Sequence, residues 1–224
     1  MNEIKAIIFD LDDTLHDGDY YSEIAFKESI ATMISAGLHC SLHEGLKVMY
    51  ELIEEDPKRD KFSDLARKIG PFTQEIIEKG KQVYHNCDIV DLKIFPETIY
   101  TLEKLQIIPL VLLTQGSQIQ QQKKIDILGI RKFFHQIHCV ELGSKKDYLE
   151  KICSELSLHP SNILVIGDRI DHEISHGNQL GMQTMRIMKG KYKKLEPINN
   201  EEKPHFTISN LLEIMSGLSG KIIE

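Results

Sequence analysis

Apolar residues in this sequence follow two periodicities, and the change between them divides the chain. Residues 6–9 form an apolar run, led in by Ile4, that is typical of a buried parallel strand. Between about residues 21 and 86 the apolar positions instead recur every three or four residues, which is the spacing of amphipathic helices. We therefore predict one strand followed by about four helices, with no strand among those helices.

From residue 95 onwards, apolar runs alternate with helical segments. Such alternation predicts a parallel sheet with helices on both of its faces. We therefore expect an α/β fold with a Rossmann-like core at 1–16 and 90–224, and an all-helical cap domain, inserted after the first strand, at 17–89. The strands expected after the insertion cover 107–113, 137–140, 163–166, 184–188 and 206–208.

Short local motifs predict where some helices begin and end. Ser41 and Glu44 have the three-residue spacing of a capping box, so a helix should begin directly after Ser41. Pro71 should lie in the first turn of a later helix, where its missing N–H costs nothing. After Asp168 we expect a single helix that continues to Gly181.

The composition is that of an ordinary globular protein. Of the 224 residues, 41% are hydrophobic and 27% are charged, and this length allows a core with a smaller inserted domain. The net charge of −7 disfavours a nucleic-acid partner held by general electrostatics. Any chemistry on phosphate must therefore be local, carried by a metal and a few basic side chains.

The cysteines and the apolar segments bear on the cellular location. The four cysteines include no CxxC pair, and a chain of this size does not need disulfides, so we expect reduced thiols. The first residues do not resemble a signal peptide, and no apolar stretch is long enough to span a bilayer. We therefore expect a cytoplasmic protein without a membrane partner, and its oligomeric state stays open.

Three carboxylates, at Asp10, Asp12 and Asp13, follow the first predicted strand. Carboxylates crowded at the end of a buried strand repel one another and lose hydration, and a cation removes both penalties. We therefore expect a hard metal such as Mg2+ there. In open parallel sheets ligands bind at the carboxyl ends of the strands, so polar groups after the later strands should lie nearby. Those groups are Thr114-Gln115-Gly116, Lys145-Lys146 and Gly167-Asp168.

The order and spacing of these groups resemble the haloacid dehalogenase superfamily. The segment Asp10-x-Asp12-x-Thr14, after four apolar residues, is similar to the opening motif of that family, and the later polar groups follow in the family's order. The resemblance implies that Asp10 is a nucleophile and that Asp12 is a general acid/base. It also favours a phosphatase, because the dehalogenases of the family lack the second acid.

The phosphate is expected to contact Thr114, Gln115 and a lysine. By the resemblance, Thr114 donates its hydroxyl and Gln115 donates its backbone N–H to phosphoryl oxygens. The Lys-Pro pair that is common in the family is absent, and Lys145 and Lys146 are both candidates. We favour Lys145, because it lies one helical turn before Leu149, the first expected buried residue of its helix.

The metal is expected to be held by Asp10, the main-chain carbonyl of Asp12, Asp168 and a second acid. Glu173 has the spacing that the family usually has for this second acid, and Asp171 is the alternative. We favour Glu173, although its side chain is longer than the usual aspartate.

Together these features predict a Mg2+-dependent phosphohydrolase that cleaves a small phosphomonoester through an aspartyl-phosphate intermediate. Two alternatives stay open. One is a phosphomutase that passes the phosphoryl group to a sugar hydroxyl, and the other is a catalytically silent binding module of the same fold. The sequence does not distinguish sugar phosphates, phosphoglycolate and nucleotides as substrates.

Overall fold

The structure, a computed structural model, describes residues 3–88, 91–141 and 144–218. The chain divides into two compact units, one formed by Met1–Gly18 with Asp91–Glu224 and the other by Asp19–Val90. The predicted first boundary, after residue 16, lies two residues before this division. The predicted second boundary, between residues 89 and 90, lies outside the described residues. None of the described helices is long and apolar enough to cross a membrane.

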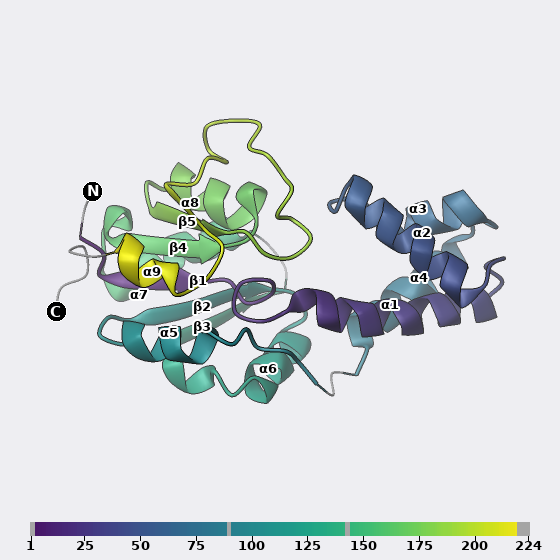
Figure 1. Cartoon of the computed structure of the whole chain (residues 1–224), viewed down its shortest axis with the longest axis horizontal. Coiled ribbons are helices and arrows are strands. Elements are labelled where there is room, and N and C mark those ends of the chain that lie inside the picture. Colours follow the sequence, from purple (N-terminus) through teal and green to yellow (C-terminus); the bar gives the residue numbers. More distant parts are fainter. Residues whose placement is uncertain (1–2, 89–90, 142–143, 219–224) are drawn as a thin grey trace. The chain divides into compact units, whose positions relative to one another are not determined.

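The first unit is built on a six-stranded sheet in the order β3-β2-β1-β4-β5-β6, with every neighbouring pair parallel (Figure 1). At its centre Ile8 of β1 pairs with Val111 of β2 on one side and with Val165 of β4 on the other. The predicted α/β, Rossmann-like fold class is confirmed. The strands are β1 (Ala6–Phe9), β2 (Leu110–Gln115), β3 (Gln136–Val140), β4 (Ile163–Gly167), β5 (Gln183–Ile187) and β6 (Phe206–Ile208).

The start of β2 differs from the prediction, which placed it at residue 107. The strand begins at Leu110, directly after Pro109, which has no backbone N–H to donate to a neighbouring strand. Ile107 is 64% exposed, so the apolar run extends beyond the strand that it predicted. The position of a proline therefore decides this boundary better than hydrophobicity does.

The α-helices described in this unit are α5 (Thr98–Leu105), α6 (Gln118–Ile127), α7 (Lys145–Leu156), α8 (Ser175–Gln179) and α9 (Glu213–Gly217). Alternate residues of β1 face opposite sides of the sheet. Ile7 and Phe9 belong to a core cluster that includes residues of α5, α6 and α9. Ile8 belongs to a second cluster that includes Leu149 and Ile152 of α7. Helices therefore cover both faces of the sheet, and each buried aliphatic side chain contributes roughly 1.5–3 kcal/mol.

The segment after β4 is not the single helix that the sequence predicts. It begins as a π-helical segment, η3 (Ile170–Ile174), and continues as the short helix α8. Single π turns are rare, and they occur frequently at functional sites.

The second unit is helical, and the described residues of 19–88 contain no strand. Ser41 is the N-cap residue of α2 and accepts a hydrogen bond from the backbone N–H of Glu44 at 3.2 Å, as the capping motif predicts. The prediction for Pro71 is wrong: α4 begins at Gln74, and Thr73 caps it, since Thr has the side-chain acceptor that Pro lacks. The helices are α1 (Gly18–Ser35), α2 (Leu42–Glu55), α3 (Lys61–Ile69) and α4 (Gln74–Asn86).

Candidate active site

The central strands of the first unit end at one cavity of about 190 Å³. Asp10 follows β1 and donates its backbone N–H to the carbonyl of Ile166 on β4, which holds it at the edge of the sheet. Thr114 near the end of β2 and Asp168 after β4 reach the same cavity. The side chains that line the cavity are Asp10, Asp12, Asp13, Thr114, Gln115, Lys145, Asp168, Arg169, His172, Glu173, Lys191 and Tyr192.

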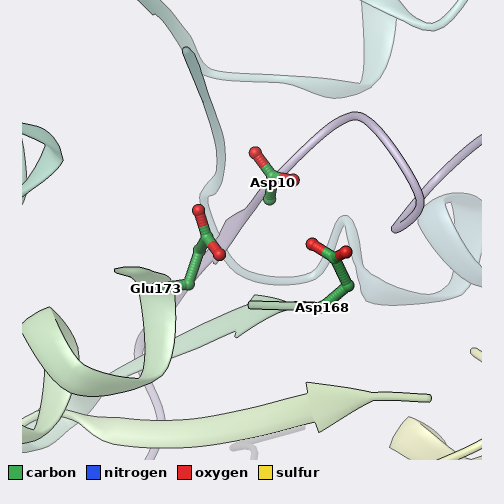
Figure 2. A group of neighbouring side chains, drawn as sticks. All are labelled: Asp10, Asp168 and Glu173. Atoms are coloured by element: carbon green, nitrogen blue, oxygen red, sulfur yellow. The ribbon is translucent and has the colours of Figure 1, made fainter. Parts of the chain in front are cut away.

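Three buried carboxyl groups, of Asp10, Asp168 and Glu173, converge in this cavity (Figure 2). Each offers an oxygen, and these oxygens lie within 4.8 Å of one another. Burial raises the pKa of Asp10 to about 7, even though Lys145 opposes the shift. Burial and the neighbouring Asp10 carboxylate raise the pKa of Asp168 well above its usual range. Ionisation of three buried carboxyl groups so close together is unfavourable, and a divalent cation bound among them would offset the repulsion.

The donor atoms fit a hard divalent cation. All are carboxylate oxygens, which are the ligands that Mg2+ prefers. Oε1 of Glu173 accepts a hydrogen bond from Lys145, whereas Oε2 is buried and has no hydrogen-bond partner among the described residues. A buried carboxylate oxygen without a partner is unusual, and a metal ion is one way to satisfy it.

Lys145, not Lys146, reaches the carboxylates. Its Nζ lies 2.5 Å from Oδ1 of Asp10 and also contacts Glu173. Burial alone would lower the pKa of Lys145, but the two carboxylates outweigh burial and raise it. Lys146 lies outside the cavity lining, and its backbone N–H is capped by the Ser144 side chain at the start of α7.

Glu173, not Asp171, joins the carboxyl group. The η3 turn carries Glu173 against the end of β4, where a Cβ on Gly167 would lie 2.5 Å from its Cγ. Glycine at position 167 therefore makes room for this longer acid. Asp171 instead accepts hydrogen bonds from Nε and Nη2 of the Arg169 guanidinium, at 3.2 and 2.9 Å.

Thr114 and Gln115 lie at the end of β2, next to the turn that leads into α6. Thr114 is buried, and Gly116 after it has a φ of +145°, a conformation that favours glycine. The backbone N–H of Gly116 donates to the carbonyl of Val140 at 3.0 Å, which fixes the turn against β3. Thr114 therefore lines the cavity next to a turn that is hydrogen-bonded to β3.

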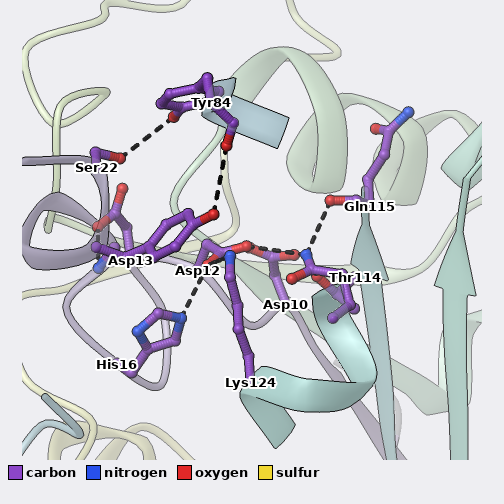
Figure 3. A network of polar contacts seen from close by, with 12 residues as sticks. Asp10, Asp12, Asp13, His16, Ser22, Tyr84, Thr114, Gln115 and Lys124 are labelled. Atoms are coloured by element: carbon purple, nitrogen blue, oxygen red, sulfur yellow. Dashed lines mark hydrogen bonds and ion pairs between the residues drawn. The ribbon is translucent and has the colours of Figure 1, made fainter. Parts of the chain in front are cut away.

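Asp12 lies in a polar network that the sequence did not reveal (Figure 3). Its Oδ1 lies 2.8 Å from Nε2 of His16 and accepts a hydrogen bond from Nζ of Lys124 at 2.7 Å. Its Oδ2 accepts from the amide nitrogen of Gln121 at 3.0 Å. Burial alone would raise the pKa of Asp12, but Lys124 and the hydrogen bond from His16 outweigh it and hold the pKa well below its usual range.

Gln121 connects this network to the end of β2. Its amide nitrogen lies 2.6 Å from Oγ1 of Thr114 and 2.9 Å from the carbonyl oxygen of Gln115. A sequence signal for this arrangement does exist. The buried face of α6 carries Gln121, Lys124 and Ile125, so two of the three positions that should be apolar are polar.

Arg169, Lys191 and Tyr192 form another side of the cavity that was not predicted. The Arg169 guanidinium lies 4.5 Å from the centre of the Tyr192 ring, within the range of a cation–π interaction. His172 also lines this side, and burial and the nearby Arg169 lower its pKa to about 4. This side therefore presents a neutral imidazole, an aromatic ring and basic groups.

Comparisons with known proteins agree with this geometry. Residues 4–181 match the family model described as haloacid dehalogenase-like hydrolase. The chain is 36% identical to a glyceraldehyde 3-phosphate phosphatase of Methanocaldococcus jannaschii, over 95% of this chain and 96% of the relative. It is 33% identical to a protein of the same name from Methanopyrus kandleri, over 95% and 96%.

Among solved structures, the HAD-hydrolase YfnB of Bacillus subtilis, described as bound to magnesium, superposes with a TM-score of 0.72. Its sequence is 19% identical, and the match covers 97% of this chain and 99% of that one. At this identity the likeness supports the fold alone. The family match and the two relatives go further, and the chain therefore belongs to the haloacid dehalogenase-like hydrolases, as an enzyme of their phosphatase branch.

Proposed function

We propose that this chain is a Mg2+-dependent phosphohydrolase that cleaves a small phosphomonoester through an aspartyl phosphate on Asp10. The observation that carries the proposal is the meeting of Asp10 with Lys145 and with two further acids, Asp168 and Glu173, at the centre of the sheet edge. A carboxylate nucleophile beside a buried ammonium and a cation site suits attack on an anionic phosphate.

In the proposed reaction a carboxylate oxygen of Asp10 attacks phosphorus, and the bond from phosphorus to the ester oxygen breaks. Asp12 is ionised in the free enzyme, because Lys124 and His16 outweigh burial and hold its pKa low. It first takes up a proton, gives it to the departing oxygen, and then takes one from the water that attacks the aspartyl phosphate. Inorganic phosphate leaves, and the Asp10 carboxylate is restored. Thr114 and the Gln115 backbone N–H bind phosphoryl oxygens, and Lys145 offsets their charge. Positioning and electrostatics supply most of the acceleration in such reactions.

Mg2+ is proposed to bind Asp10, the main-chain carbonyl of Asp12, Asp168 and Glu173. Two observations support this: the crowding of three buried carboxyls, and the Glu173 oxygen that has no hydrogen-bond partner among the described residues. The magnesium in YfnB is consistent with it. When bound, the ion offsets charge on the phosphoryl group during transfer.

For the substrate we propose glyceraldehyde 3-phosphate or another phosphomonoester of about three carbons. The names of the relatives from M. jannaschii and M. kandleri support this choice. Both names describe phosphatases, which favours hydrolysis over the phosphomutase alternative. Action in the cytoplasm stays a prediction from the sequence.

The test is a phosphate-release assay with glyceraldehyde 3-phosphate, phosphoglycolate and a nucleoside monophosphate. We expect release that requires Mg2+, stops with EDTA, is fastest with the triose phosphate and is abolished in Asp10→Asn. Transfer of phosphate to an added sugar without release would indicate a mutase. No turnover of any ester, with the folded protein and Mg2+ present, would support the silent module.

A further inference from the structure

The buried face of α6 carries two polar side chains that packing does not explain. Gln121 is 2% exposed and Lys124 is 7% exposed, yet they occupy positions beside Ile125 that an aliphatic residue would fill. Taking a lysine out of water is expensive, and replacing a buried ion pair with apolar residues is often neutral or stabilising. The pair therefore calls for an explanation other than the stability of the fold.

We propose that Gln121 and Lys124 are positioning residues that orient Asp12 and Thr114 for phosphoryl transfer. This inference rests on the proposed function, because it assigns them a task in that reaction. Neither side chain lines the cavity, whereas Asp12 and Thr114 both do. They therefore act through the two groups that contact the substrate.

The first part of the task is to fix the carboxylate of Asp12. Its side chain is 33% exposed, and a short acid at a cavity mouth can otherwise adopt more than one rotamer. Lys124 binds Oδ1 at 2.7 Å and Gln121 binds Oδ2 at 3.0 Å, so each oxygen is held from α6. A general acid must lie within hydrogen-bond reach of the proton's destination, and this attachment keeps it in one place.

The second part concerns the direction of a hydroxyl. The amide group of Gln121 faces the Asp12 carboxylate and the Gln115 carbonyl, neither of which can donate, so its nitrogen must be the atom on that side. An amide nitrogen does not accept hydrogen bonds. Oγ1 of Thr114, 2.6 Å from this nitrogen, therefore accepts, and its own hydrogen points elsewhere, available for a phosphoryl oxygen.

The orientation of the Gln121 amide destabilises the fold, which is expected if that orientation serves Asp12 and Thr114. Oε1 of Gln121 is buried and has no hydrogen-bond partner in the described part of the chain. A buried acceptor without a partner destabilises a fold. The amide is thus oriented so that the two hydrogens on its nitrogen face three acceptor oxygens, one of them shared, and its own oxygen is left without a partner. One side chain sets the geometry of both the acid/base and the phosphate-binding hydroxyl.

The test compares Lys124→Met with Lys123→Met, a matched control on the exposed side of the same helix. The measured quantity is kcat/KM for an aryl ester, p-nitrophenyl phosphate, and for an alkyl ester, glycerol 3-phosphate. An aryl leaving group needs no protonation, so a poorly positioned acid should affect the alkyl ester more. We expect Lys124→Met to lose at least about tenfold more on the alkyl ester, and Lys123→Met to match wild type on both.

A double-mutant cycle separates positioning from a purely structural effect. With the aryl ester, hydrolysis of the aspartyl phosphate still needs Asp12, so kcat falls in Asp12→Asn and in Lys124→Met. We expect the double variant to be no slower than Asp12→Asn alone, within about twofold.

Gln121→Leu should also raise KM for both esters, because Thr114 loses its fixed orientation. Circular dichroism and thermal melting verify folding, and Lys124→Gln replaces Lys124→Met if that variant does not fold.

The inference is overturned if Lys124→Met loses equally on both esters, or if the losses in the Asp12→Asn and Lys124→Met cycle are fully additive. The proposed function survives either result as long as wild type releases phosphate and Asp10→Asn does not. Failure of the proposed function has a different signature: wild type releases no phosphate, or Asp10→Asn retains activity. That outcome would contradict the proposed function and, with it, the positioning role of Gln121 and Lys124.

Discussion

The replacement of Lys145 by Met tests the centre of the site most directly. Its Nζ lies 2.5 Å from Oδ1 of Asp10, and its side chain is 4% exposed. At an effective dielectric constant of about 20, opposite charges at this separation attract by roughly 7 kcal/mol, and desolvation of both groups cancels a large part of that. Loss of one preorganised charge donor typically lowers turnover by about 10²–10³-fold, or about 2.7–4 kcal/mol. We expect Lys145→Met to fall in that range.

The same replacement should change stability in a pH-dependent way. Without Lys145 the Asp10 pKa, already about 7, rises further above that of the unfolded chain. A raised carboxyl pKa costs stability only where the unfolded carboxyl is ionised, above about pH 4. Removal of one partner of a buried ion pair typically lowers the free energy of unfolding by about 3–5 kcal/mol. Asp10 can take up a proton, which limits this cost, so we expect Lys145→Met to lose about 3 kcal/mol at pH 8 and progressively less towards pH 4.

Two measurements check these values, and Lys146→Met is the matched control. Turnover of one phosphomonoester is measured with saturating Mg2+, and the free energy of unfolding is measured by denaturant titration in EDTA from pH 4 to 8. Lys146 lies outside the cavity lining, so its variant should stay within about threefold of wild type. The reasoning is refuted if Lys146→Met is the slower enzyme, or if the stability loss of Lys145→Met is largest at pH 4.

Three further predictions concern Asp10, Asp12 and the metal. Asp10→Asn should turn over at less than about a hundredth of the wild-type rate with an unchanged circular dichroism spectrum, and faster turnover would argue against a covalent role. Asp12→Ala should lose far more activity on alkyl than on aryl phosphates, and equal losses would contradict an acid/base role. Mg2+ affinity should rise at least about tenfold between pH 6 and pH 8, because the cation competes with a proton on Asp10, whose pKa is about 7. Calorimetric titration tests this, and a flat profile would contradict it.

The sequence predicts the sheet well because each strand is a buried apolar run, and burial on both faces leaves few other arrangements. It fails where backbone hydrogen bonding decides a boundary. Pro109 delays the start of β2, and Thr73 rather than Pro71 marks the start of α4. The π-helical turn of η3 was also missed, since hydrophobic periodicity does not separate one π turn from an α-helix in so short a segment.

Four of the predicted site residues share one property: each lies at or just after the end of a strand, or begins a helix, at the same sheet edge. Asp10, Thr114, Lys145 and Asp168 meet because the carboxyl ends of parallel strands meet, which the order of elements already implies. The choice of Lys145 over Lys146 rested on helical phase, and the structure places Lys145 in the cavity. The choice of Glu173 over Asp171 rested on family spacing, and Gly167 provides the room that the longer acid needs.

Gln121 and Lys124 were missed for the opposite reason, since they lie in the middle of a helix and meet residues more than a hundred positions away. Lys124 contacts Asp12, 112 residues earlier in the chain, and only the packing of α6 against the sheet joins them. Yet the pattern contained a sign, because a helix with only one apolar residue at three successive buried positions, Ile125, has a weak reason to pack. Where a packed helix has polar residues at such positions, it must gain something from them other than apolar burial, and here their partners are Asp12 and Thr114. Polar interruptions of an expected buried face, traced to the groups that they contact, therefore lead from the sequence to the parts of a site that motifs do not contain.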